Sequence, residues 1–430
     1  MQRLLLRRAA LPALAAVAGG YSVLAARAEG AEDASVPIEE YTEEPRPPLK
    51  IFSGSAHPKL ASQVAEHLGV PLGLSVTSRF NDGEVNIKFN ESIRGADVFI
   101  VQPTCSPVND SLMELLLMVS AARRSSAATI TAVIPYFGYK RSVGRPHAML
   151  GGHQQGYETP VSAADIATML ELMGVDRVIT VEFYPPGHGQ TDGFFRDSRS
   201  TIDNIEVTDV GVRHFSSKVY TRPLVVISPN PQFVQKAHDF ALGMRDAAKR
   251  FGRPLEVRVA LALKPKTAAG VKFGEAGNMQ ILGDVSGCDV VIVDDTIDTG
   301  KTLRKTTRQL RDDGAERIFV FATHGLFNGD CLRLLDGTAI EEIVVTDSIP
   351  ISPSHETQPM GKVVRLGMAE RLANVIQSVY EETSIHSFQA YREDTDMGRY
   401  SGQDSQAPED RDDGDGGEEE EEEEEEVRPR

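Results

Sequence analysis

Two adjacent carboxylates at the end of an apolar run are the residues in this sequence best placed to do chemistry. The run Val290-Val-Ile-Val293 leads into Asp294 and Asp295, and then into Asp298, Thr299, Gly300 and Thr302. A strand that passes through a short turn into a helix presents backbone N–H groups and hydroxyls at the helix N-terminus, where anions bind. The strand-end carboxylates can hold ribose hydroxyls or a hydrated Mg²⁺. A simple helix cap would need only one of these side chains.

The turn at Gly300-Lys301-Thr302 also resembles part of a Walker P-loop. That motif requires an earlier glycine at a fixed spacing, because several backbone N–H groups must wrap around the phosphates. The glycine is absent here, and we therefore reject a P-loop.

The elements that must position this loop alternate between strands and helices. Apolar runs predict strands over residues 98–101, 130–134, 177–181, 224–227, 290–293, 319–322 and 343–345. Periodic stretches predict helices over residues 59–68, 111–123, 163–172, 233–249, 302–311 and 362–380. Buried β-branched runs separated by helices indicate parallel strands covered on both faces. We predict an α/β chain with two tandem doubly wound domains, whose ligands lie beyond the carboxyl ends of the strands.

The predicted domain boundaries follow from a break near residues 200–222 and from the composition of the two ends. They are a targeting segment and linker over 1–49, α/β domains over 50–205 and 206–380, and an acidic tail over 381–430. Arg3, Arg7 and Arg8 precede an uncharged run from Ala9 to Ala26. That composition is typical of a mitochondrial or other organellar presequence. A membrane anchor or secretory signal, or a disordered extension of a cytoplasmic protein, are the alternatives.

Charge is spread unevenly along the chain. Residues 401–430 hold 15 acids and three arginines, and so contribute −12 of the net charge of −18. The rest is mildly acidic, which argues against a nucleic-acid partner. The nine glutamates from Glu418 to Glu426 predict a disordered tail. Three cysteines cannot form a disulfide framework and fit a reducing compartment.

Ordered motifs over roughly residues 50–373 resemble the ribose-phosphate diphosphokinase (phosphoribosyl pyrophosphate synthetase) family. The loop at 294–302 is similar to the ribose-5-phosphate loop that this family shares with phosphoribosyltransferases. Further similar segments in the family's order are 79–84, 91–100, 107–116, 133–139, 174–181, 193–195, 322–327 and 344–350. A plain phosphoribosyltransferase would share only the loop at 294–302, so the other segments favour the synthetase family.

The resemblance implies a phosphoribosyltransferase-like fold and transfer of the ATP pyrophosphoryl group to ribose 5-phosphate with Mg²⁺. It places Asp294, Asp295, Asp298, Thr299, Gly300 and Thr302 around ribose 5-phosphate, and Arg79, Phe80, Asp82, Glu84 and Arg141 around ATP. It also implies that Arg141, Lys264 and Lys266 are catalytic. The implied partners are ATP, ribose 5-phosphate and synthetase paralogues in a homo- or hetero-oligomer. Membrane association is expected only if the N-terminal segment is an anchor.

The sequence departs from the family pattern at the metal and flexible-loop positions. Tyr184 stands where the family has a metal-binding histidine, and His188 is the candidate replacement. Asn230 stands at a family aspartate position and keeps an oxygen ligand without the charge. Lys264-Pro-Lys266 replaces a Lys-x-Arg pair, which loses the bidentate fork of arginine. These changes leave two hypotheses, a divergent diphosphokinase or a catalytically weak regulatory subunit that assembles with an active synthetase.

Overall fold

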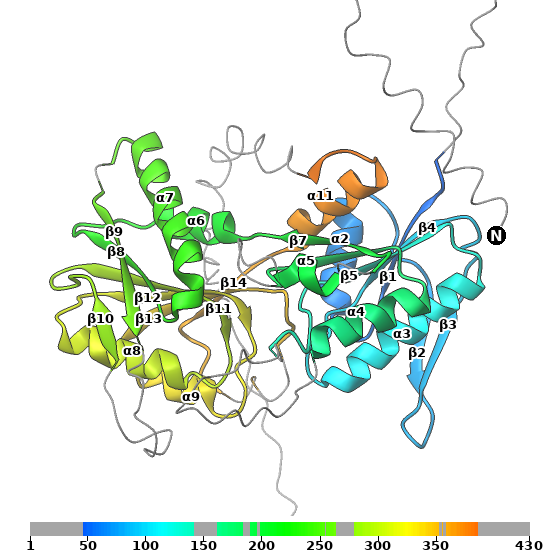
Figure 1. Ribbon diagram of the computed structural model, residues 1–430, viewed down its shortest axis with the longest axis horizontal. Helices are drawn as coiled ribbons and strands as arrows, with labels where there is room; N and C mark the ends of the chain where they lie inside the picture. Colours follow the sequence, from blue (N-terminus) through cyan, green and yellow to red (C-terminus); the bar gives the residue numbers. More distant parts are fainter. Residues whose placement is uncertain are drawn as a thin grey trace, which may run out of the picture. The chain divides into compact units, whose positions relative to one another are not determined.

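The computed structural model describes residues 46–141, 161–183, 190–195, 198–253, 255–263, 279–351, 355 and 358–385. Residues 1–45 of the predicted targeting segment and linker, and residues 386–430 of the predicted tail, lie outside this part of the chain. The described residues form two predominantly parallel sheets with helices around them, which confirms the predicted α/β class (Figure 1). No helix in the described ranges is long and apolar enough to cross a bilayer.

The first sheet has five parallel strands in sequential order. They are β1 (Leu49–Ser53), β4 (Asp97–Val101), β5 (Thr129–Ile134), β6 (Arg177–Val181) and β7 (Thr201–Ile205). Both faces of these strands are apolar. In β4, for example, Val98 and Ile100 pack into one core, whereas Phe99 and Val101 pack into another. A sheet of this kind needs a helical layer on each side.

One of the two helical layers of the first sheet joins helices from opposite ends of the described chain. On one face lie α3 (Val108–Arg124), α4 (Ser162–Met173) and the short α5 (Gln190–Phe195). On the other lie α2 (Pro58–His67) and α11 (Ala369–Tyr380), which are next to each other in Figure 1. Leu372 and Ile376 of α11 share a core with Ile51 and Val64. The last helix of the predicted second domain therefore completes the core of the first sheet.

The second sheet has seven strands and reverses its order at the centre. The order is β10 (Gln280–Leu282), β9 (Val257–Leu263), β8 (Leu224–Ser228), β11 (Asp289–Ile297), β12 (Ile318–Gly325), β13 (Ile340–Thr346) and β14 (Val363–Leu366). All neighbours are parallel except β10 and β9. The chain moves from β8 to β9 on one side and then returns to β11 on the other side of β8. Ligands bind beyond the carboxyl ends of strands at such a reversal.

Aromatic and aliphatic side chains fix the helices on both faces of the second sheet. The helices α6 (Thr208–Ser216) and α7 (Val234–Arg250) cover one face, where Phe215, Phe240 and Phe321 pack together. The helices α8 (Lys301–Asp312) and α9 (Cys331–Asp336) cover the other. A short 3₁₀ helix, η1 (Pro231–Phe233), follows β8 and lies against β11.

An antiparallel hairpin is attached to the first half and projects from it in Figure 1. Its strands are β2 (Ser75–Arg79) and β3 (Val85–Phe89), joined by residues 80–84. The ring of Phe89 packs edge-on against Phe52, with 4.6 Å between ring centroids. This contact holds the base of the hairpin on the first core, while its turn remains exposed.

The predicted helix over residues 362–380 is wrong in its first part. Val363-Val-Arg-Leu366 forms β14, which pairs in parallel with β13, and α11 begins only at Ala369. The β-branched pair suits an edge strand, and Gly367 separates strand from helix. Likewise, residues 201–205 form β7 although the sequence predicted a break there.

Candidate active site at the carboxyl end of β11

The loop between β11 and α8 has the conformation that an anion site needs. Gly300 is the N-cap residue of α8 and has a φ of 69°, a left-handed conformation that favours glycine. A Cβ atom at this position would lie 2.9 Å from Cys331 Sγ. Because Gly300 has no side chain, the N-cap residue does not occupy the N–H groups of the first turn. Thr299 is exposed beside them, and Thr302 lies in that turn.

The two carboxylates of Asp294 and Asp295, near the carboxyl end of β11, differ in their surroundings. The backbone N–H of Asp295 donates a hydrogen bond of 3.0 Å to Oδ1 of Asp294. Burial raises the pKa of Asp294 well above its usual value, and the neighbouring charge of Asp295 raises it further. Both effects make the charged form of Asp294 less favourable than that of an ordinary exposed aspartate.

Lys236 connects this strand end to the first half of the chain. Its ammonium donates to Oε2 of Glu182 at 2.6 Å, to the carbonyl oxygen of Asp294 at 2.8 Å and to Oγ1 of Thr323 at 2.8 Å. The Lys236 side chain is fully buried in α7, and Glu182 follows directly after β6. An ammonium with three oxygen partners fixes the peptide of Asp294. The position of the carboxylate pair is thus tied to both halves.

Two basic residues of the first half face the acidic residues of the loop. Arg141 forms an ion pair of 2.7 Å with Asp298, whose other oxygen accepts a 2.6 Å hydrogen bond from Asn328. The Lys140 ammonium lies 3.7 Å from Oδ2 of Asp295 and donates to the Glu182 carbonyl at 2.9 Å. Burial lowers the pKa of Lys140, although Asp295 and Glu182 oppose this shift. The structure therefore brings the predicted Arg141 together with the predicted ribose loop.

The predicted adenine segment lies at the turn of the hairpin. Arg79 pairs with Asp110 of α3 at 3.2 Å, and Oδ1 of Asp82 accepts from the Glu84 N–H at 3.1 Å. Phe80 is 55% exposed, although its side chain is large and apolar. Asn109, next to Asp110, accepts a hydrogen bond from the hydroxyl of Tyr139. The turn end of the hairpin thus reaches the N-terminus of α3, which also holds Tyr139 in the segment before Arg141.

Asn230 lies next to β11 but already has a local structural role. Its Oδ1 accepts a 3.2 Å hydrogen bond from the Gln232 N–H and caps η1. Its carbonyl oxygen accepts from Ser228 Oγ at 2.6 Å. The other predicted metal and catalytic residues, His188, Lys264 and Lys266, lie outside the described residues.

Comparison with known proteins covers both halves of the chain. Residues 49–174 match the N-terminal domain of ribose phosphate pyrophosphokinase, and residues 255–389 match the phosphoribosyl synthetase-associated domain. Ribose-phosphate pyrophosphokinases from Pasteurella multocida and Vibrio cholerae are 39% and 40% identical to it over 339 residues. These alignments cover 79% of this chain and 98% of each relative. The chain belongs to the ribose-phosphate pyrophosphokinase family.

A crystal structure of phosphoribosylpyrophosphate synthetase from Mycobacterium smegmatis supports this assignment at the level of the fold. It is 30% identical, has a TM-score of 0.65, and the match covers 78% of this pyrophosphokinase-family chain and 99% of that structure. The family assignment thus extends over both sheets, as the ordered motifs predicted.

His324, a buried polar residue next to the candidate site of this pyrophosphokinase-family chain, was not predicted from the sequence. His324 at the end of β12 donates through Nε2 to the Val181 carbonyl at 3.1 Å, so Nδ1 accepts from Ser348 Oγ at 2.8 Å. Burial lowers its pKa well below the usual value, and Lys140 and Lys236 lower it further. A neutral His324 thus links the two halves. The sequence does contain a sign of this residue, because the polar pair Thr323-His324 ends an otherwise apolar strand.

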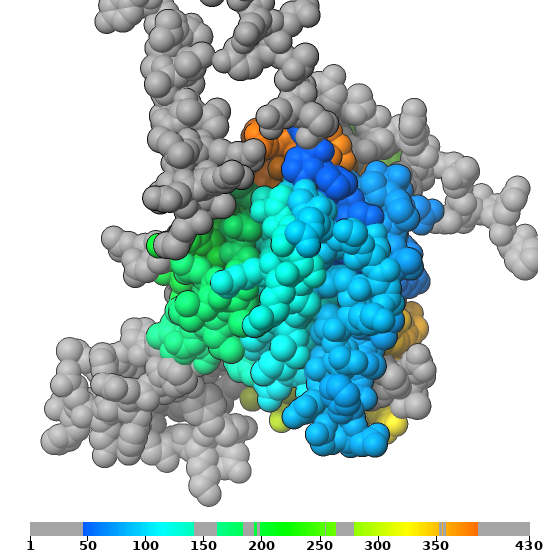
Figure 2. All heavy atoms as spheres, turned by 90° about the vertical axis from the view of Figure 1, so that its right-hand side faces the viewer, coloured from blue at the N-terminus to red at the C-terminus, as the bar shows by residue number. Residues whose placement is uncertain are grey.

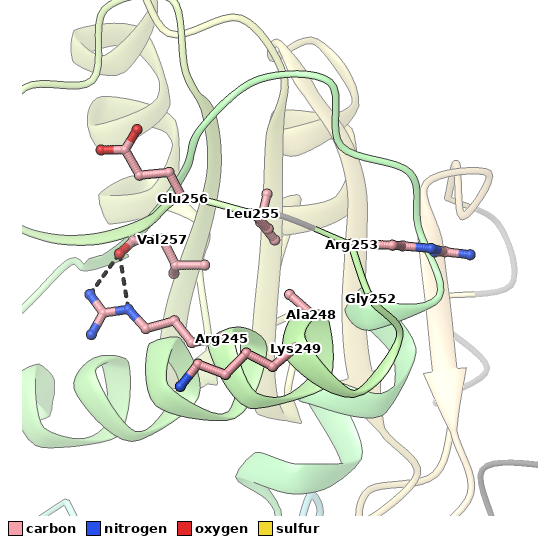
Figure 3. Close-up of a pocket in the computed structure, with 8 residues that line it drawn as sticks. All are labelled: Arg245, Ala248, Lys249, Gly252, Arg253, Leu255, Glu256 and Val257. Carbon is pink, nitrogen blue, oxygen red and sulfur yellow. Dashed lines mark hydrogen bonds between the residues drawn. The ribbon is translucent and has the colours of Figure 1, made fainter.

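A surface hollow elsewhere on the second half does not have the character of a catalytic site. It lies where α7 ends and β9 begins, and therefore at the amino-terminal edge of the sheet (Figure 3). The Arg245 guanidinium donates two hydrogen bonds to the Val257 carbonyl oxygen, at 2.6 and 3.1 Å. The side chains of Lys249 and Arg253 point in different directions in Figure 3. The carboxyl ends of β8 and β11 remain the candidate site.

Proposed function

We propose that the chain is a ribose-phosphate diphosphokinase, which converts ATP and ribose 5-phosphate to phosphoribosyl pyrophosphate and AMP for nucleotide biosynthesis. The observation that carries this proposal is the 2.7 Å ion pair between Arg141 and Asp298. In a chain of this family, it joins a basic residue of the predicted ATP side to the predicted ribose loop. Both substrates must meet at such a junction for a group to pass between them.

The loop after β11 suits a sugar phosphate at both of its ends. The 5-phosphate would lie against the first turn of α8, where Gly300 leaves N–H groups accessible and the helix dipole favours negative charge. The sugar hydroxyls would donate to Asp295 and Asp298 at the strand end. The anomeric oxygen would then face the side chains that come from the first half.

The reaction requires positioning and charge neutralisation more than covalent help from the protein. The anomeric oxygen bonds to the β-phosphorus of ATP, and the bond from that phosphorus to the oxygen it shares with the α-phosphorus breaks. AMP leaves with that oxygen, and the sugar hydroxyl loses its proton. Arg141 would stabilise the added charge on the phosphoryl oxygens. Lys264 and Lys266 are proposed to do the same, and Arg79, Phe80, Asp82 and Glu84 are proposed to bind adenine.

Mg²⁺ is the proposed cofactor. It usually keeps several waters and binds through few protein carboxylates together with substrate phosphates. The described residues hold no cluster of three His, Cys, Asp or Glu side chains that could bind a metal ion. His188 and the Asn230 amide oxygen, which has a second lone pair, are the proposed ligands. When bound, the ion would neutralise charge on the phosphate oxygens.

We also propose that the chain assembles into a homo-oligomer or with synthetase paralogues. The large apolar side chain of Leu172 on α4 is 71% exposed, and Met169 on the same helix is partly exposed. Exposed apolar side chains on one helix suit a protein interface better than a free surface. The molar mass of the purified chain in solution, measured by light scattering, tests this assembly.

The decisive assay follows AMP formation from ATP and ribose 5-phosphate with Mg²⁺ by the purified full chain. Arg141→Ala should lower kcat by about 10²- to 10³-fold, because a charge-stabilising donor is lost. Arg124→Ala, at an exposed site on α3, is the matched control and should leave turnover unchanged. A folded chain without turnover would sink the proposal. If that chain altered the rate of an added active synthetase, it would instead be a regulatory subunit.

A further inference from the structure

Two buried lysines approach the carboxylate pair of β11 from different elements. Lys236 belongs to α7 and bonds to the carbonyl oxygen of Asp294. Lys140 belongs to the first half, is 3% exposed and lies 3.7 Å from Oδ2 of Asp295. The positive charge next to the Asp295 carboxylate is therefore supplied by a side chain of the protein, the Lys140 ammonium.

Lys140 is held in this position by more than the charge of Asp295. Its ammonium donates to the carbonyl oxygen of Glu182 at 2.9 Å, just after β6 ends. The same ammonium lies 5.7 Å from the centroid of the Tyr136 ring. The position of the ammonium is therefore set by one backbone acceptor and one aromatic face besides Asp295, and does not depend on this carboxylate alone.

A resident ammonium changes what Asp295 can bind. A divalent cation on this carboxylate would lie close to a buried positive charge, where repulsion is strong because little water screens it. Sugar hydroxyls meet no such repulsion. They can donate to Asp295 and accept from the Lys140 ammonium.

We propose that Lys140 is the resident cation of the ribose loop, and that ribose 5-phosphate binds this loop without a divalent metal ion. The inference rests on the proposed function, because it takes ribose 5-phosphate as the substrate of the loop. The inference adds that the reaction needs Mg²⁺ for the phosphates of ATP and not for binding of ribose 5-phosphate. Lys140 is thereby a substrate-binding residue of the sugar site.

Calorimetric titration of ribose 5-phosphate into the full chain, without ATP, tests this inference. The wild type should have the same Kd in EDTA and in Mg²⁺. Lys140→Met should weaken binding about tenfold in EDTA, because a charged donor is lost from the site. Mg²⁺ should restore part of that loss, since the carboxylate is then free to take a cation. Lys140→Arg keeps the charge and should stay closer to the wild type than Lys140→Met.

Lys305→Met is the matched control for a lost positive charge, because Lys305 is exposed on α8 close to the same loop. It should leave the Kd of ribose 5-phosphate unchanged. Thermal unfolding of each variant shows that the folded protein is what is titrated.

Three results would overturn the inference. They are wild-type binding that requires Mg²⁺, a Lys140→Met protein that binds like the wild type in EDTA, and a wild type that does not bind ribose 5-phosphate at all. AMP formation by a wild type that needs Mg²⁺ to bind the sugar phosphate would leave the proposed function intact. The expected titrations without AMP formation would refute the proposed function alone.

Discussion

The ammonium of Lys236 donates to the carboxylate of Glu182 across 2.6 Å and joins the first turn of α7 to the end of β6. Both side chains are almost completely buried. Replacing only one member of such a buried ion pair costs much stability, because the charge of the other member stays buried without a partner.

Replacing one member of this pair should therefore destabilise the chain strongly. Lys236→Met should lower the free energy of unfolding by about 3 to 5 kcal/mol in chemical denaturation. Lys249→Met on the same helix removes an exposed partner of Asp246 and should cost about 0 to 1 kcal/mol. The double variant Glu182→Gln/Lys236→Met should lose less than the sum of its single variants. Simple additivity would show that the pair is not coupled.

The two carboxylates of β11 should respond differently to neutralisation. Asp294→Asn preserves the shape of the side chain and the oxygen that accepts from the Asp295 N–H. Since burial and the charge of Asp295 already disfavour the charged form of Asp294, this variant should change the Kd of ribose 5-phosphate by about threefold or less. Asp295→Asn removes the charge opposite Lys140 and should weaken binding about 10- to 100-fold. Isothermal titration measures both constants. Equal losses of affinity in the two variants would contradict this difference between the two carboxylates.

His57 should make the stability of the chain fall with acid. Its Nδ1 accepts from the Leu60 N–H, its Nε2 donates to the Asp347 carbonyl, and burial lowers its pKa from 6.5 to about 4. The unfolded chain takes up a proton below pH 6.5 that the folded chain takes up only near pH 4. The stabilisation is thus complete above pH 6.5 and is lost progressively as the pH falls through 4.

The measurement is the free energy of unfolding of the wild type and of His57→Asn, which keeps a capping side chain but does not titrate. Between pH 7.5 and 5.0 the wild type should lose about 2 kcal/mol more than the variant. Buried acids such as Asp347, whose raised pKa acts in the opposite direction, are common to both proteins and cancel. Parallel pH curves would rule out His57 as the source.

Gly300 should tolerate no side chain. Gly300→Ala places a Cβ atom 2.9 Å from Cys331 Sγ at a φ of 69°, and should cost about 2 to 3 kcal/mol of stability and weaken ribose 5-phosphate binding. Gly329→Ala is the control, because its φ is 63° and no atom lies within 4 Å of the added carbon. Gly329→Ala should cost only about 1 kcal/mol. Similar losses for both variants would show that crowding is unimportant.

The sequence predicted the strands and helices whose signal is local. The apolar run before Asp294 and the turn at Gly300 are adjacent in the chain, so their strand, loop and helix could be recognised together. By contrast, β14 was predicted as helix, because its pairing with β13 is a long-range contact that periodicity does not report.

The same distinction separates the parts of the site. Asp294, Asp295 and Asp298 stand in one short motif, but Lys140 and Lys236 reach it from 155 and 58 positions away. Lys236 in particular occurs in an ordinary amphipathic helix, where a lysine usually faces water. Only the packing of α7 on β11 and β12 turns it inward. His188, Lys264 and Lys266 stay predictions.

The position of α11 has a consequence for folding of the chain during its synthesis on the ribosome. Ile51 on one face of the first sheet and Val64 of α2 pack with Leu372 and Ile376 of α11, which are translated after the whole second sheet. A nascent chain that has been synthesised as far as β7 still exposes this apolar surface to chaperones and to other nascent chains. The core of the first sheet is therefore completed only after α11 has been synthesised, so the first half depends on the last helix of the second.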